Sequence, residues 1–164
     1  KKTMATQQLV MYEEEFRQIN GVLTRLGKEA NAKIVFLVDK NGQLIAAIGE
    51  VQNIDTTSLA SLTAGNIAAT GGLAKLIGEK EFSILFHEGE RDNIHISIVG
   101  QRIILVVIFD QRSSLGLVRL RVKKAGDELG SIFDKLMRKV EKEPAVESPF
   151  AEITDEDIDN LFRE

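Results

Sequence analysis

The chain has 164 residues, of which 43% are hydrophobic and 28% are charged, the composition of a globular domain with room for a tail. It contains no cysteine, which excludes disulfide bonds and thiolate metal sites and, without a visible signal peptide, favours a cytoplasmic protein. Its longest apolar run, Ile103–Phe109, is too short to cross a bilayer. Residues 143–164 carry eight acids and one arginine, a net charge of −7. Since the whole chain has a net charge of −4, the remaining residues have a net charge of only +3. Neither membrane insertion nor nucleic-acid binding is therefore expected.

The first predicted element is an amphipathic helix. Apolar residues from Val10 to Leu26 recur at spacings of three and four. Next, Lys33–Asp39 is a β-branched and aromatic run that predicts a strand buried on both faces. Asn41-Gly42 follows as a hairpin signal, and Gln43–Glu50 is the returning strand.

A second helix is predicted to start near residues 55–58 and to end at Gly78. We expect its apolar stripe to lie on the sheet: Leu59, Leu62, Ala69, Leu73 and Leu76. The opposite side, called here the bare face, carries mostly small residues: Ser61, Ala64, Ala68, Gly72 and Lys75. Small residues at this spacing either fill an exposed helix or let a partner's backbone approach closely, and the lack of charge favours the second interpretation.

Three further strands are predicted at 82–87, 93–99 and 102–110, the last apolar throughout and therefore central. A long helix then holds a near-heptad spacing from Leu115 to Val140, although its opening LVRLRV also alternates as a strand would. The order α-β-β-α-β-β-β-α predicts an α+β domain whose five-stranded, mostly antiparallel sheet carries helices on both faces.

The predicted domain covers residues 4–142, and residues 1–3, which precede Met4, are expected to come from an expression vector. Residues 143–164 form an acidic linker, interrupted by Pro144 and Pro149, that leads to a short C-terminal helix capped by Thr154. Such a short helix needs a partner to become ordered. The apolar residues of this segment are the candidate contacts: Phe150, Ile153, Ile158, Leu161 and Phe162.

No catalytic site, metal site or cofactor site is predicted. His87 and His95 alternate with apolar residues and are interpreted as strand-surface histidines. Gly71-Gly72 lies in mid-helix and lacks the Gly-Lys-Ser/Thr sequence of a phosphate loop. Arg91, Arg102 and Arg112 lie near loops or strand ends and could reach outward to a partner, as the inserted arginine of some enzyme activators does, although loop arginines are usually only solvated.

Several segments together resemble the roadblock (dynein light-chain) family, in particular its bacterial members that regulate a small GTPase. These segments are FLVDKNGQLI, NIDTTSLASLTAGN, GGLAKLIGE, SSLGLVRLR and SPFAEITDEDIDNLF, and the resemblance covers residues 4–164. It implies a roadblock fold and a homodimer in which two sheets join edge to edge, with the second helices together on one face.

The resemblance further implies that this helix pair binds a small Ras-like GTPase of the MglA type, preferring its GTP-bound form. The partner-binding residues would be Ala64, Ala68, Gly72 and Lys75, together with the tail residues named above. Relatives of this kind are expected to reposition the GTPase's own catalytic groups without inserting an arginine. The C-terminal helix would contact the GTPase elsewhere and promote nucleotide exchange or stabilise the complex.

The sequence therefore predicts a cytoplasmic GTPase-activating protein in bacterial cell polarity and gliding motility, enriched at a cell pole. An alternative is a non-catalytic scaffold of a polarity or motor complex, which would bind the GDP and GTP forms alike. A small-ligand sensor needs a roomy pocket between helix and sheet, and the many Leu, Ile and Val residues predict a filled core instead.

Overall fold

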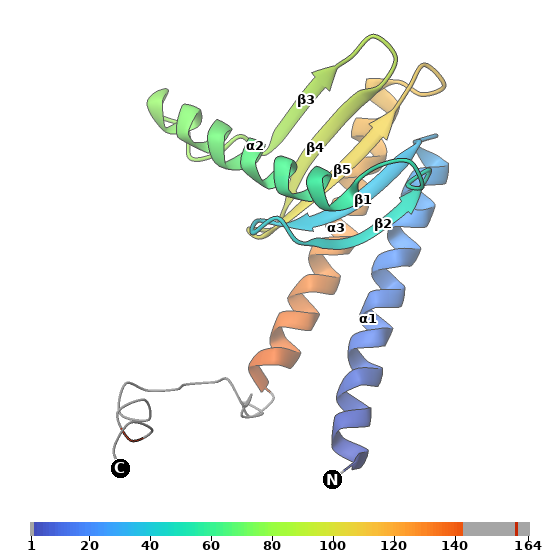
Figure 1. Cartoon of the computed structure of the whole chain (residues 1–164), viewed down its shortest axis with the longest axis vertical. Coiled ribbons are helices and arrows are strands. Elements are labelled where there is room, and N and C mark those ends of the chain that lie inside the picture. The colour runs from blue at the N-terminus through green and yellow to red at the C-terminus, as the bar shows by residue number, and fades with distance from the viewer. Residues whose placement is uncertain (1, 143–159, 161–164) are drawn as a thin grey trace.

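The computed structural model describes residues 2–142 and residue 160, with side chains from residue 13 onward. Its elements are α1 (Lys2–Glu29), β1 (Ile34–Asp39), β2 (Leu44–Gly49), α2 (Thr56–Leu76), β3 (Ile84–Glu88), β4 (Asn93–Val99), β5 (Ile103–Phe109) and α3 (Leu115–Lys142). The predicted order of helices and strands is confirmed (Figure 1). The predicted strand bounds are met to within two residues. The segment LVRLRV belongs to α3.

The five strands form one sheet in the order β2-β1-β5-β4-β3, and every neighbouring pair is antiparallel. The predicted hairpin turn joins β1 to β2. Gly42 has φ +90°, a conformation that glycine adopts without strain. The carboxylate of Asp39 accepts hydrogen bonds from the backbone N–H of Asn41 and of Gln43, both at 2.9 Å, which fixes the turn.

Helix α2 covers one face of the sheet, and α1 and α3 cover the other (Figure 1). The central strand β5 contributes to both cores because successive side chains point to opposite faces. Ile104, Val106 and Ile108 belong to the core under α2. Leu105, Val107 and Phe109 belong to the core under α1 and α3. This double coverage explains why the apolar runs of β1 and β5 show no alternation.

The prediction for His95 was wrong. Its side chain is only 1% exposed, whereas His87 is exposed as predicted. Alternation along β4 correctly placed His95 on the opposite face from Ile94 and Ile96, but α3 lies over that face and leaves the His95 side chain almost inaccessible to solvent. Among the described helices, none is both long and apolar enough to cross a membrane.

Candidate functional site

Helix α2 begins after Asp55, whose carboxylate caps it. The Asp55 side chain accepts hydrogen bonds from the Ser58 hydroxyl at 2.7 Å and from the Ser58 backbone N–H at 3.1 Å. These two bonds favour the ionised form and lower the pKa of the Asp55 carboxyl below its ordinary value. Asp55 thus fixes where the helix starts, and hence which of its residues meet the sheet.

The predicted sheet-facing stripe of α2 was right for Leu59, which is half-buried and packs against the core under α2, and wrong for its other four residues, Leu62, Ala69, Leu73 and Leu76, which are exposed. The residues buried against the sheet are Ala60, Thr63, Ile67 and Ala74. Leu62, Leu73 and Leu76 are 72%, 56% and 84% exposed. The helix therefore lies on β1 and β2 mainly through Ala60, Thr63, Ile67 and Ala74, with Leu59 beside them, and its other three leucines are turned away from the protomer's own core.

The bare face lies on the outer side of α2, as the sequence predicts. Ser61, Ala68, Gly72 and Lys75 are exposed, and Ala64 is half-buried. A shallow groove of about 370 Å³ runs along this face. Lys40 and Glu81, which both line the groove, form an ion pair with 3.0 Å between Lys40 Nζ and Glu81 Oε1. The groove is lined by Lys40, Ala64, Ile67, Ala68, Gly71, Gly72, Lys75, Lys80 and Glu81. All four α2 residues predicted to bind the partner thus line one groove.

Packing within the protomer does not explain the glycines of α2. A Cβ atom added at Gly65, Gly71 or Gly72 would meet no atom within 4 Å. Each glycine in a helix interior costs about 1 kcal/mol relative to alanine, so these positions weaken the helix without any gain inside the described protomer. Open space above a glycine-rich helix is the geometry that permits close approach by another backbone.

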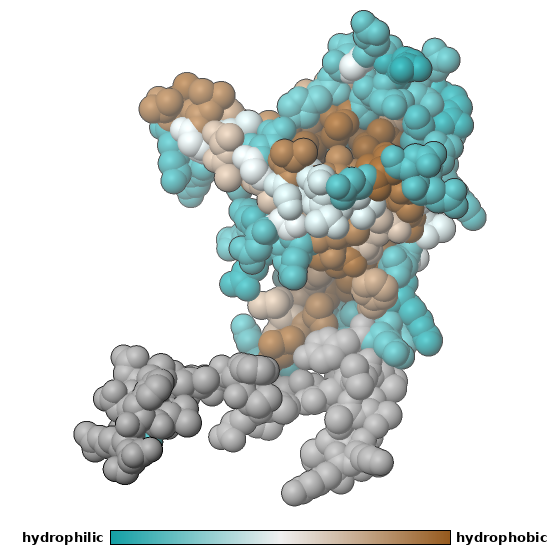
Figure 2. Space-filling model, in the orientation of Figure 1, coloured by the Kyte–Doolittle hydropathy of each residue, from teal (hydrophilic) through white to brown (hydrophobic). Residues whose placement is uncertain are grey.

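A second exposed surface of α2, called here the apolar flank, consists of Leu62, Leu73, Leu76 and Ile77. Ile77, at the C-cap, is 66% exposed like its leucine neighbours. Figure 2 shows hydrophobic residues gathered at the end of α2 that projects beyond the sheet. An apolar cluster of this kind on a monomer's surface marks an interaction site.

Strand β3 lies at the same side of the molecule as the apolar flank. It is an edge strand, paired only with β4 among the described strands. The Asn66 side chain of α2 lies 3.2 Å from His87 Nε2 on β3, so this side of the helix faces that edge. Ile84 of β3 is 49% exposed. An open strand edge beside an apolar helix surface can pair with a second sheet and bury both features together.

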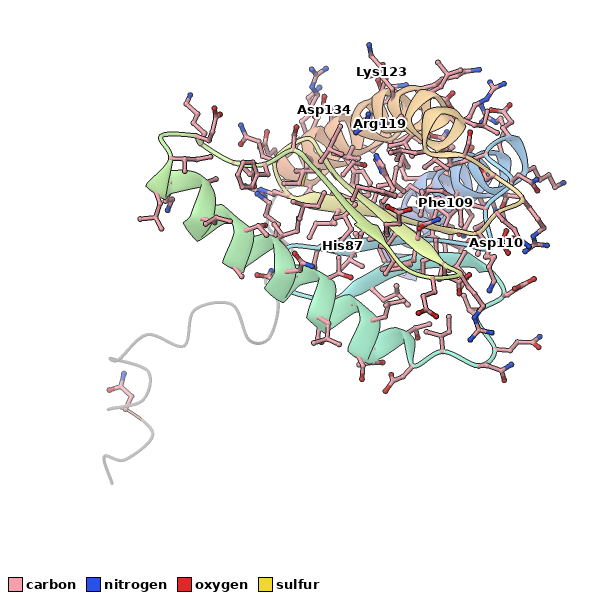
Figure 3. The ribbon with its side chains drawn as sticks, turned by 90° about the horizontal axis from the view of Figure 1, so that it is seen from above. His87, Phe109, Asp110, Arg119, Lys123 and Asp134 are labelled. Carbon is pink, nitrogen blue, oxygen red and sulfur yellow. The ribbon has the colours of Figure 1, made fainter. Side chains whose placement is uncertain are left out.

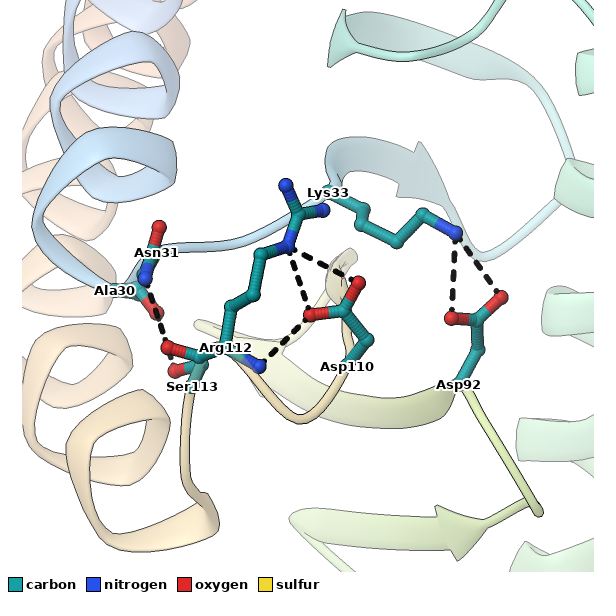
Figure 4. A network of polar contacts seen from close by, with 7 residues as sticks. All are labelled: Ala30, Asn31, Lys33, Asp92, Asp110, Arg112 and Ser113. Carbon is teal, nitrogen blue, oxygen red and sulfur yellow. Dashed lines mark hydrogen bonds and ion pairs between the residues drawn. The ribbon is translucent and has the colours of Figure 1, made fainter.

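The three candidate arginines differ in their surroundings. Arg112 Nε donates to Asp110 Oδ1 at 3.0 Å, an interaction that lowers the pKa of the Asp110 carboxyl (Figure 4). Asn31 Nδ2 donates to the Arg112 carbonyl oxygen at 2.7 Å. Arg112 therefore helps to join the end of β5 to the α1–β1 connection. Arg91 and Arg102 are exposed and form no ion pair among the described residues.

Within the described residues, no group of three or more His, Asp or Glu side chains is arranged to hold a metal ion. The predicted contacts Phe150, Ile153, Ile158, Leu161 and Phe162 lie outside the described residues. The surface that the structure does place is therefore the α2 groove, with the apolar flank and the β3 edge beside it.

The Roadblock/LC7 domain family matches residues 19–109, which run from α1 through α2 to the end of β5. The chain belongs to this family. Other known proteins support the membership. MglB of Myxococcus xanthus is 70% identical, with a TM-score of 0.73 over 75% of this chain and 92% of that one. The gliding protein MglB of Thermus thermophilus is 33% identical, with a TM-score of 0.70 over 74% of this chain and 92% of its own.

Two further relatives extend the comparison. An MglB with a tetrameric arrangement is 32% identical and has a TM-score of 0.71, over 74% of this chain and 91% of that one. An uncharacterized protein of Methanocaldococcus jannaschii is 29% identical over 115 residues, which is 70% of this chain and 99% of that protein. The roadblock fold inferred from the sequence is thereby confirmed.

Sequence reasoning located the bare face but missed the apolar flank. The missed signal was that α2 carries apolar residues on more than one side of the helix. A helix that is apolar on several sides must be covered on several sides. Taking the largest residues as the sheet-facing ones was the error, because the small residues Ala60 and Ala74 let the helix lie close to the strands.

Proposed function

We propose that this protein is a GTPase-activating protein for a small Ras-like GTPase of the MglA type, acting in bacterial cell polarity and gliding motility. The observation that carries the proposal is the 70% identity to Myxococcus xanthus MglB, which spans 92% of that chain. In this role the protein regulates an enzyme and supplies no catalytic residue of its own. We also propose that it acts in the cytoplasm near a cell pole.

The active form proposed is a homodimer. Two copies would pair along their β3 edges and bring their apolar flanks together, extending the sheet across a two-fold axis. This arrangement would cover Leu62 and Leu73, which are 72% and 56% exposed in the protomer. The assembly of a related MglB into a tetramer supports self-association in this group of proteins.

In the dimer, the two bare faces would form one docking surface for the GTPase. Ala64, Ala68 and Gly72 present little side-chain volume, so a flexible segment of the GTPase could lie close to the helix backbone. Lys75 adds a positive charge at the end of the groove. Holding that segment would align the GTPase's own water-positioning and arginine groups, and alignment of reacting groups lowers a barrier by up to about 7–11 kcal/mol.

The tail is proposed as a second contact. Residues 143–164 combine net negative charge with Phe150, Ile153, Ile158, Leu161 and Phe162, the composition of a short amphipathic helix. Bound to the GTPase away from the bare face, this segment would promote nucleotide exchange or stabilise the complex. Residues 4–142 would then form the roadblock domain, and the tail a separate binding element.

The proposal is tested by the nucleotide preference of binding. The cognate GTPase is loaded with GDP or with a non-hydrolysable GTP analogue, and its affinity for the dimer is measured by calorimetry. An activator binds the GTP form more tightly, and Ala68→Arg removes that binding because it fills the groove. Ser131→Arg, which adds the same side chain at an exposed position of α3, serves as the matched control. Equal affinity for both nucleotide forms would instead support a scaffold.

A further inference from the structure

A cavity of about 580 Å³ lies between α3 and the β3–β4 hairpin, on the sheet face opposite α2. The filled core predicted from the abundance of Leu, Ile and Val is therefore not found in this part of the domain. Strands β3 and β4 contribute one wall, and α3 contributes the other. The cavity lining includes Ile84, His95, Ser97 and Val99 on the strands and Arg119, Val122, Lys123 and Gly126 on α3.

Two buried polar side chains line this cavity. His95 is 1% exposed and Ser97 is 7% exposed. Within the described part of the chain, neither ring nitrogen of His95 has a hydrogen-bond partner, and the Ser97 hydroxyl has none either. Buried polar groups in native proteins are nearly always paired, so these groups call for a partner from outside the fold.

The protonation state of His95 determines what kind of partner it can take. Burial and the nearby charge of Arg119 both lower the pKa of His95, burial being the larger cause. The imidazole is therefore neutral at physiological pH and offers one N–H donor and one acceptor nitrogen. Together with the Ser97 hydroxyl, it provides two hydrogen-bond donors on one wall of the cavity.

The opposite wall is positively charged. Arg119 and Lys123 are one helical turn apart on α3, on the side of the sheet away from α2 and His87 (Figure 3). Neither side chain takes part in an ion pair among the residues that the structure describes. Asp127 is the one acidic residue of the lining. Two cations against one anion leave a positive field beside the two buried donors.

We propose that this cavity binds a small amphipathic carboxylate. Its carboxylate group would accept hydrogen bonds from Arg119, Ser97 and His95, and its hydrocarbon body would lie against Ile84, Val99 and Val122. The site is separate from the α2 groove and does not depend on GTPase binding. If a second copy of the chain or its own acidic tail covers the mouth of this cavity, the small carboxylate will not bind there.

The two histidines of the chain provide a direct assay. The imidazole resonances of His95 and His87 are followed by NMR while octanoate is added to the full-length protein. Octanol, which lacks the charge, and acetate, which lacks the hydrocarbon body, are the control probes. Octanoate is expected to shift His95 in a saturable manner and to leave His87 unchanged. Octanol should bind at least about fivefold more weakly, and acetate should cause no saturable shift.

Two variants test the location of the site. A Cβ atom at Gly126 would lie 3.8 Å from Val99 Cγ2, an ordinary contact, so Gly126→Leu extends into the cavity without a clash at the backbone. It should abolish the His95 shift, whereas Gly116→Leu, whose added Cβ meets nothing within 4 Å, should not. Arg119→Gln should weaken octanoate to the level of octanol. An unmoved His95 resonance, equal binding of octanol, or full binding by Gly126→Leu would each overturn the proposal.

Discussion

Truncation of Leu73 on the apolar flank is expected to weaken the proposed homodimer. Burying a leucine completely contributes about 1.5–3 kcal/mol, and 56% of the Leu73 side chain is exposed in the protomer. Covering that fraction would contribute about 1 kcal/mol in each copy. Since a two-fold interface uses the same residue twice, Leu73→Ala should cost about 2 kcal/mol of association free energy. The dissociation constant of the dimer should therefore rise about 30-fold.

Sedimentation equilibrium measures this change directly. Leu120→Ala is the matched control, because Leu120 is similarly exposed, at 63%, but lies on α3 across the sheet. The control should leave the monomer–dimer equilibrium unchanged. If Leu73→Ala dimerises as tightly as the unchanged protein, or if Leu120→Ala weakens the dimer equally, the apolar flank is not the dimer interface.

Three further changes have defined outcomes. Burial and Arg119 lower the pKa of His95, so in acid the unfolded chain takes up a proton that the folded chain excludes. The contribution of His95 to the free energy of unfolding should therefore be constant above the ordinary histidine pKa of 6.5 and should fall as the pH drops below it. Denaturant titrations across that range should show a smaller fall for His95→Leu than for the unchanged protein, and an equal fall would contradict this. Gly42→Ala should lower the free energy of unfolding by about 1–3 kcal/mol, because φ is +90° and the added Cβ would lie 3.3 Å from Ser61 Cα. Denaturant unfolding at the same midpoint as the unchanged protein would contradict this. Deleting residues 148–164 should weaken GTPase binding in calorimetry while the dimer persists, and unchanged affinity would exclude the tail as a contact.

The architecture of the sheet could be predicted because each strand carried a local signal. Asn41-Gly42 fixed the first hairpin, and the uninterrupted apolar run of β5 placed it at the centre of the sheet. These signals depend on neighbouring residues and on burial from both faces, which one sequence records directly. The position of His95 could not be predicted, because coverage of β4 by α3 depends on how distant elements pack.

The candidate site was predicted only in part, because some of its features depend on neighbouring residues and others on how distant elements pack. Small residues revealed that one side of α2 is bare, and Ala68 and Gly72 do line a groove. Which other side meets the sheet depended on close packing of Ala60 and Ala74, and residue size alone wrongly placed Leu62, Leu73 and Leu76 against the sheet. The cavity beside α3 left no local signal, because it reflects the distance between a helix and two strands.

Single-turnover GTP hydrolysis by the cognate GTPase tests the proposed function most directly. The rate is measured for the GTPase alone, with this protein, and with its Ala68→Arg and Ser131→Arg variants. The proposal predicts that the protein and the Ser131→Arg control accelerate hydrolysis, and that Ala68→Arg does not, although it still forms dimers. Binding without any acceleration would contradict a GTPase-activating role and leave the bare face as a docking surface only.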